Sequence, residues 1–190
     1  MNDSMSDSPA KGAPYSGPGA AEIDDWSERV YRALSTWPIA QTGEWSRWEP
    51  GYLLLTINRA GDEPIEPVML DTADQELTVT CGRWHDHLDR EGSEEATLEA
   101  LAEQAKALIG DWLNGKFQIA VYSDTDERWC GSTVIRPGDL DAQLEETARH
   151  LRHLTPTSIE LQSVHKRDWK ILAVKPDWLT PPVLPPNRLP

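Results

Sequence analysis

Two histidines and a carboxylate stand at alternate positions near the middle of the chain. His85, His87 and Asp89 form a His-x-His-x-Asp motif, which directly follows the strand-like segment 76–81. Side chains two residues apart project from the same face of an extended chain. Nitrogen and oxygen ligands of this kind bind zinc or a similar divalent ion. The motif therefore indicates one candidate function, a metal-dependent hydrolase with a carboxylate as general base.

The motif is similar to the first ligand motif of the metallo-β-lactamase family, which continues His-x-His-x-Asp-His. Arg90 stands at the last position of this pattern, which removes one ligand and adds a positive charge. The similarity covers only these few residues, and the family also requires later ligands on separate loops of a larger sandwich. We therefore do not assign the chain to this family.

A second histidine pair offers another way to complete a metal site. His150 and His153 are three residues apart on a predicted helix and so share one face of it. Together with His85 and His87 they would close a four-ligand site if the two pairs meet in the fold. The structural alternative is that His85 and His87 are partly exposed at a strand end and hydrogen-bond to Asp86 or to the backbone. Because short motifs often match by chance, we favour that alternative and expect no metal and no cofactor.

Nucleophilic catalysis has less support. Cys81 or Cys130, together with His85 and Asp86, supplies the residue types of a Cys-His-Asp site. Cys81 falls on the apolar side of its strand, however, where a small buried residue is expected. The chain also lacks a Gly-x-Ser-x-Gly motif and a phosphate-binding glycine loop. We therefore predict no catalytic residue.

The periodicity of the apolar residues predicts the elements that position these side chains. Helices are expected near residues 22–36, from Ser93 to just before Gly115, and after Pro137. Strands are expected at residues 52–58, 67–70, 76–81, 116–122, 128–135, 158–164 and 169–174. Trp45 and Trp48 are assigned to an aromatic loop, and Pro38 is expected to stop the first helix. The pattern indicates an α+β fold, a mainly antiparallel sheet with helices packed on one face.

Composition divides the chain into three segments. Residues 1–20 are predicted to be a disordered N-terminal tail, because they carry almost no large apolar side chains. Residues 21–174 are predicted to form a single α+β domain. Residues 175–190 are predicted to be an extended, proline-rich C-terminal tail, although Trp178, Leu179, Val183 and Leu184 are able to pin it against the body.

The negative charge of the chain limits its partners. Asp and Glu number 32 against 18 Lys and Arg, which gives a formal net charge of −14. Such a protein repels nucleic acids and anionic lipid surfaces and attracts basic protein surfaces. No apolar run approaches the ~20 residues of a membrane-spanning helix, the N-terminus lacks the pattern of a secretion signal, and two cysteines do not indicate a disulfide framework. We expect a cytoplasmic protein that binds neither nucleic acid nor membrane, and its oligomeric state stays open.

Acidic residues concentrate around the predicted helix that follows Ser93. Between residues 86 and 103 they are opposed only by Arg90, and they are Asp86, Asp89, Glu91, Glu94, Glu95, Glu99 and Glu103. Smaller acidic groups occupy the predicted hairpin loop 124–127 and the predicted helix start 139–146. If the two helices lie on the same face of the sheet, these carboxylates form one continuous negative surface. The alternative is an ordinary solvated helix face.

The nine tryptophans are either core anchors or binding hot spots. We expect Trp26, Trp112 and Trp169 in the core. Trp84 and Trp129 both stand beside short polar segments, and for these two both interpretations stay open.

The order of strand, Trp-His-x-His, acidic helix, hairpin and Trp-Cys-Gly-Ser across residues 76–135 resembles small acidic bacterial immunity-type proteins, which neutralise secreted toxins. The resemblance implies a cytosolic inhibitor that binds a basic protein partner, a toxin or a nucleic-acid enzyme, and blocks its active site. Its carboxylates would mimic the acidic groups of the partner's substrate, with an apolar anchor beside them. The implied partner-binding residues are Trp84, Asp86, Asp89, Glu91, Glu94 and Glu95. A regulatory or scaffold subunit, which binds without inhibiting, is the third alternative.

Overall fold

The structure, a computed structural model, describes residues 13–14, 23–48, 51–58, 67–88 and 97–180. It contains two antiparallel sheets with helices, so the predicted α+β class is confirmed. The chain divides into two compact units. Among the described residues, the first unit comprises 13–58, 68–79 and 87–105, and the second comprises 67, 80–86 and 106–180.

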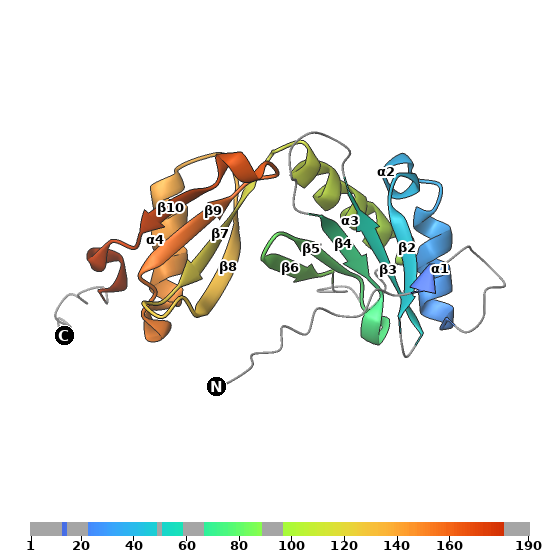
Figure 1. The fold of residues 1–190 in the computed structure, drawn as a ribbon, viewed down its shortest axis with the longest axis horizontal. Coiled ribbons are helices and arrows are strands. Elements are labelled where there is room, and N and C mark those ends of the chain that lie inside the picture. Colours follow the sequence, from blue (N-terminus) through green and yellow to red (C-terminus); the bar gives the residue numbers. More distant parts are fainter. Residues whose placement is uncertain (1–12, 15–22, 49–50, 59–66, 89–96, 181–190) are drawn as a thin grey trace, which may run out of the picture. The chain divides into compact units, whose positions relative to one another are not determined.

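The first sheet has its six strands side by side in the order of the sequence (Figure 1). They are β1 (Ala13–Pro14), β2 (Glu44–Trp48), β3 (Tyr52–Ile57), β4 (Val68–Asp71), β5 (Thr78–Cys81) and β6 (Trp84–His87). In β3 the buried side chains alternate as expected for a strand with one core face, and Leu53, Leu55 and Ile57 are all buried. The predicted strand at 52–58 is therefore confirmed. The aromatic loop predicted around Trp45 and Trp48 was wrong, because that segment is β2, paired with β3.

The first unit also contains the helices α1 (Asp25–Leu34) and α2 (Pro38–Gln41). Asp24 caps α1, since its carboxylate accepts a hydrogen bond of 2.6 Å from the backbone amide of Ser27. The spacing of four buries Trp26, Val30 and Leu34 on one face. The first helix does end before Pro38, as predicted, but this proline then opens α2, because a proline fits the first turn of a helix.

A buried polar contact fixes α1 to the first sheet. The hydroxyls of Ser27 and Thr72 lie 2.5 Å apart, and both residues are fully buried. Thr72 Oγ1 also accepts a hydrogen bond of 2.9 Å from the backbone amide of Leu53. Because a buried hydroxyl without a partner costs free energy, this contact specifies the position of the helix on its sheet.

Helix α3 (Leu98–Leu113) follows the first sheet in the chain. Its predicted start at Ser93 lies outside the described residues, and Thr97 Oγ1 accepts a hydrogen bond of 3.3 Å from the amide of Ala100. The core face of α3 buries Leu101, Ala105, Ile109 and Trp112, whereas Leu108 is only half-buried. Gly115, at φ 66°, stands just past the helix end as predicted.

The second sheet consists of four antiparallel strands in the order β10-β9-β7-β8. The strands are β7 (Gln118–Ser123), β8 (Trp129–Ile135), β9 (Ser158–Gln162) and β10 (Lys170–Ala173). Both predicted hairpins, β7–β8 and β9–β10, are confirmed. Helix α4 (Leu140–His150) connects them, and its N-cap is Asp139, whose carboxylate accepts a hydrogen bond of 3.1 Å from the amide of Ala142.

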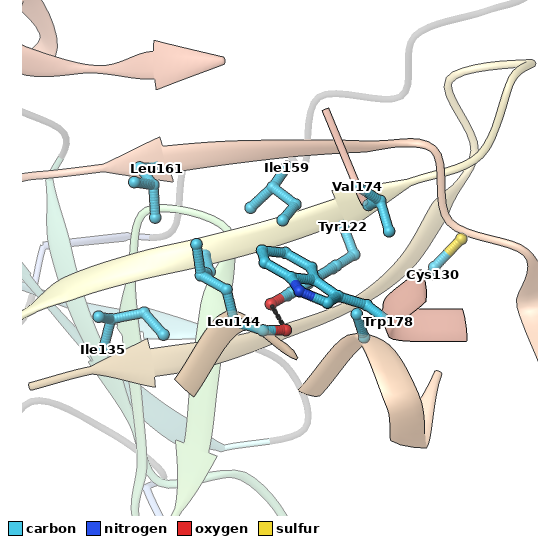
Figure 2. Close-up of a cluster of buried hydrophobic side chains, with 10 residues drawn as sticks. Tyr122, Cys130, Ile135, Leu144, Ile159, Leu161, Val174 and Trp178 are labelled. Carbon is cyan, nitrogen blue, oxygen red and sulfur yellow. Dashed lines mark hydrogen bonds between the residues drawn. The ribbon is translucent and has the colours of Figure 1, made fainter. Parts of the chain in front are cut away.

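The core of the second unit lies between its sheet and α4 (Figure 2). Tyr122 of β7 is fully buried there, and its hydroxyl donates a hydrogen bond of 3.0 Å to the backbone oxygen of Leu144 in α4. Trp178 packs into the same core from a short 3₁₀ helix, Pro176–Leu179. Part of the predicted C-terminal tail therefore packs against the second sheet through this tryptophan.

Three further 3₁₀ helices complete the described structure, and they are Ala73–Gln75, Arg152–Leu154 and Lys166–Asp168. No helix within the described ranges has both the length and the apolar character that crossing a bilayer requires.

Candidate functional site

The histidines of the His-x-His motif lie on strand β6. His85 and His87 are exposed, whereas Trp84 and Asp86, at the alternate positions of the strand, are half-buried, so the prediction that the two histidines share one face is confirmed. His87 Nδ1 lies 3.0 Å from Glu76 Oε2 and 3.0 Å from Thr78 Oγ1. These two contacts hold the imidazole of His87 against the neighbouring strand and occupy one of its ring nitrogens.

The metal hypothesis requires a third ligand besides the two histidines. Asp89, its third ligand, lies outside the described residues. Among the residues that are described, no group of three or more His, Cys, Asp and Glu is arranged to hold a metal ion. His150 and His153 are both exposed, and His150 Nδ1 lies 2.9 Å from the backbone oxygen of Glu146. The described part of the chain therefore does not bring the two histidine pairs into one site.

The two cysteines are buried thiols. Cys81 is fully buried, as its place on the apolar side of the strand predicted, and burial raises its pKa to about 12. Burial also raises the pKa of Cys130, and the nearby Asp124 carboxylate adds to this effect. The Cys130 Sγ donates weak hydrogen bonds to the backbone oxygens of Arg128 at 3.7 Å and Leu154 at 3.6 Å. Because a nucleophile requires the thiolate, both environments oppose a catalytic role.

The structure describes only two of the predicted partner-binding residues, Trp84 and Asp86. Both are half-buried. Trp84 and Phe117 both belong to the second unit, and their rings pack edge to face with 6.4 Å between the centroids. The four remaining residues lie outside the described part of the chain, and they are Asp89, Glu91, Glu94 and Glu95. The predicted surface therefore stays a prediction.

The tryptophans differ from one another in exposure. Trp26 and Trp112 are buried, which confirms the prediction for both. The prediction for Trp169 was wrong, since this side chain is half-buried at the surface. Its Nε1 donates to the backbone oxygen of Ser163 at 3.0 Å, and Lys166 Nζ lies 5.2 Å from its ring centroid. Two polar residues, Asp168 and Lys170, flank Trp169 in the sequence, and its ring packs beside Lys166 instead of entering the core.

Trp129, by contrast, is 54 % exposed. It begins β8, which is an edge strand of the second sheet. Leu154, which is 41 % exposed, belongs to the segment beside it, because its backbone oxygen lies 3.6 Å from the Sγ of Cys130, the residue after Trp129. Two of the three large apolar side chains that are exposed in the described ranges thus belong to segments that meet at this end of the sheet.

An acidic hairpin loop adjoins this end of the sheet. Asp124 and Asp126 each form an ion pair with Arg128, at 2.8 and 3.0 Å. Partial burial of Asp124 raises the pKa of its carboxyl group. Hydrogen bonds from Arg128 and Asp126 lower that pKa by more, so it lies below its ordinary value. Glu127 is exposed at a positive φ of 61°. The Asp124 side chain is only 12 % exposed and holds the loop together, since it also accepts hydrogen bonds from the backbone amides of Asp126 and Arg128. The loop therefore presents two exposed carboxylates, Asp126 and Glu127. We call Trp129, Leu154 and the carboxylates of Asp126 and Glu127 the Trp129 patch.

Sequence reasoning did not choose between core and surface for Trp129. One signal was available, since this tryptophan directly follows the charged run Asp124–Arg128, which predicts a hairpin loop. A side chain at the first position of a strand beside such a loop has few neighbours that can cover it.

The third acidic group, at the start of α4, is largely paired. Lys175 Nζ lies 2.6 Å from Asp141 Oδ2, and Arg149 forms an ion pair with Glu145. Helix α4 packs on the second of the two sheets. A continuous negative surface over both long helices, which was expected on the basis of a single sheet, stays a prediction.

Comparisons of this chain with protein-family models, with curated proteins and with solved structures found no match. The candidate site is therefore defined by its own geometry, an exposed tryptophan and leucine beside an acidic hairpin loop.

Proposed function

We propose that this protein is an acidic, cytoplasmic inhibitor that binds a basic protein partner, a toxin or a nucleic-acid enzyme, and blocks its active site. The observation that supports it best is the Trp129 patch, in which an exposed tryptophan stands beside a loop with two exposed carboxylates. Large aromatic side chains dominate the binding energy of protein interfaces. Trp129 is a better anchor than Trp84, because more than half of its surface is exposed.

Charge supports the choice of partner. With a formal net charge of −14, the chain attracts cationic surfaces over a distance and repels nucleic acid itself. Within the patch, the carboxylate of Glu127 has no ion pair with another described residue, so it is available to an arginine or lysine of a partner. A basic enzyme that binds anionic substrates offers such groups in its active site, and carboxylates can occupy the places of the substrate's anionic groups.

The rates of association test this proposal. The full chain, immobilised by one terminus, is used to capture partners from its native cells, and the captured protein is purified. The proposal predicts a basic partner whose association rate constant falls at least about tenfold between 50 and 500 mM salt, because salt screens long-range attraction. It also predicts loss of the partner's activity at one equivalent of this protein. A partner bound at a salt-independent rate, or bound without any loss of activity, contradicts it, and the second result supports a scaffold subunit instead.

A further inference from the structure

A hollow of about 250 Å³ lies at one end of the second sheet, where β7 begins and β8 ends. Gln118 and Ile135 pair across these two strands beside it. The hairpin loop of the Trp129 patch joins the opposite ends of the same two strands. The hollow is therefore separate from the surface that we propose for the basic partner, and it requires a different ligand.

The wall of the hollow is apolar with two cationic side chains. Its apolar lining comes from Phe117, Ile135, Pro137 and Leu140, and the charged residues in the lining are Lys116 and Arg136. No carboxylate lines it, although acidic residues outnumber basic ones in the chain. An apolar wall next to a cation favours a ligand that carries both an apolar body and a negative charge.

Arg136 is the better anion ligand of the two cations. Lys116 Nζ already lies 2.8 Å from Asp111 Oδ1. The Arg136 guanidinium carbon lies 5.8 Å from the Phe117 ring centroid, and this guanidinium has no ion pair with the other residues that the structure describes. Asp139 is the first acidic residue after Arg136 in the sequence, and its carboxylate caps helix α4 by accepting a hydrogen bond from the amide of Ala142. A planar guanidinium of this kind binds a carboxylate through two parallel hydrogen bonds.

The segment that carries Arg136 is held in place before any ligand arrives. The backbone amide of Arg136 donates to Gln143 Oε1 at 3.0 Å, and Gln143 Nε2 donates back to the backbone oxygen of Arg136 at 3.0 Å. Two hydrogen bonds from one side chain fix both the position and the direction of this backbone. Less ordering is then required on binding, which favours affinity for a small ligand.

From this arrangement we propose that the hollow binds a small organic carboxylate with an apolar body, such as an aromatic acid. Its carboxylate pairs with the Arg136 guanidinium, and its body lies against Phe117, Ile135 and Leu140. The volume sets the size of the ligand, since pockets for drug-sized molecules hold roughly 300–1,000 Å³ and this one holds less. The ligand that we propose is therefore smaller than a drug-sized molecule.

A titration followed by amide NMR spectra of the full chain tests this site. Benzoate is the probe, benzyl alcohol is the neutral analogue with the same ring, and inorganic phosphate is the anion without an apolar body. We expect saturable shifts at residues 115–118, 135–136 and 138–140 with benzoate below about 10 mM, and dissociation constants at least about tenfold weaker for the other two compounds.

Two matched variants complete the experiment. Arg136→Gln removes the guanidinium and is expected to weaken benzoate binding at least about tenfold. Arg152→Gln removes the same charge from another exposed arginine of the second unit and is expected to leave binding unchanged. The absence of saturable shifts, equal binding by benzyl alcohol or phosphate, or equal binding by Arg136→Gln overturns the proposal. None of these results bears on the basic partner, since that test uses the opposite end of the sheet.

Discussion

The backbone amide of Arg83, in the turn between β5 and β6, donates a hydrogen bond of 3.1 Å to the side-chain oxygen Oε1 of Gln162 in β9. Both residues belong to the second unit, and Gln162 is fully buried. Its Nε2 donates in turn to Glu160 Oε1 at 2.7 Å. The Gln162 side chain thus accepts a hydrogen bond from the turn between β5 and β6 and donates one to a neighbouring carboxylate. We therefore expect the stability of the fold to depend on this side chain.

Replacing Gln162 by leucine tests this relationship. The substitution Gln162→Leu removes the acceptor for the Arg83 amide, and a hydrogen bond of this kind contributes about 0.5–1.5 kcal/mol. We expect the free energy of unfolding in urea to fall by that amount. Gln104→Leu, on the exposed face of α3, is the matched control and is expected to change it by less than about 0.5 kcal/mol. Equal effects of the two substitutions contradict this role of Gln162.

Gly82 and Gly110 are expected to respond in opposite directions to alanine. Gly82 has a φ of 56°, and a Cβ at this position meets the Gln162 side chain, so Gly82→Ala is expected to destabilise the protein by at least about 1–2 kcal/mol. Gly110 lies inside α3, and its Cβ meets nothing within 4 Å, so Gly110→Ala is expected to stabilise it by about 0.5–1 kcal/mol. Thermal unfolding of both variants measures these signs. Destabilisation by Gly110→Ala, or a neutral Gly82→Ala, is incompatible with this geometry.

The buried hydroxyl of Tyr122 is expected to make stability depend on pH above 10. Burial raises the pKa of Tyr122 to about 12 from 10.0, against a smaller lowering by the Thr147 hydroxyl. Below pH 10 this tyrosine is protonated in both states and contributes no pH dependence. Between pH 10 and 12 the unfolded chain loses the proton first, so the free energy of unfolding falls, by up to about 2–3 kcal/mol.

The variant Tyr122→Phe isolates this effect from the lysines that titrate in the same range. At pH 8 it is expected to be less stable than the parent by about 0.5–1.5 kcal/mol, because the hydrogen bond to Leu144 is lost. The difference is expected to shrink or reverse by pH 11.5 in urea titrations. A difference that stays constant over this range shows that the tyrosine ionises equally well in the folded protein.

Cys81 is expected to resist thiol reagents in the native state. Its pKa of about 12 leaves about a thousandfold less thiolate at pH 8 than a pKa of 9.0 does. In a Cys130→Ser variant, a colorimetric disulfide reagent should therefore modify Cys81 slowly in buffer and rapidly in 8 M urea. Fast labelling of the folded variant would reopen the Cys-His-Asp hypothesis.

Local patterns predicted the elements better than the way in which they assemble. The alternation of Leu53, Leu55 and Ile57 identified β3, since one face of that strand enters the core. Strand β2 was missed because its buried residue is Ser46, with Trp45 and Trp48 only half-buried, so no apolar alternation marks it. The division of the described strands into two sheets depends on long-range pairing, which a local pattern does not encode.

The candidate site, too, could be predicted only in part from local sequence patterns. The acidic composition and the hairpin loop at 124–127 were visible in the sequence, but the exposure of Trp129 was not. That exposure depends on β8 being an edge strand and on the segment 152–154 lying beside it. Gln162 is a similar case, because its hydrogen bond with the Arg83 amide joins residues 79 positions apart.

The affinity of the Trp129→Ala variant for the captured basic partner is the most direct test of the proposed function. Truncation of a central aromatic anchor typically costs at least about 2 kcal/mol, so we predict a dissociation constant at least about 30-fold higher, mainly through faster dissociation. Ile171→Ala, which truncates a 78 % exposed side chain on the other edge strand, is the control and is expected to bind as the parent does. A Trp129→Ala variant that binds as tightly as the Ile171→Ala variant contradicts the proposal that this end of the sheet holds the partner.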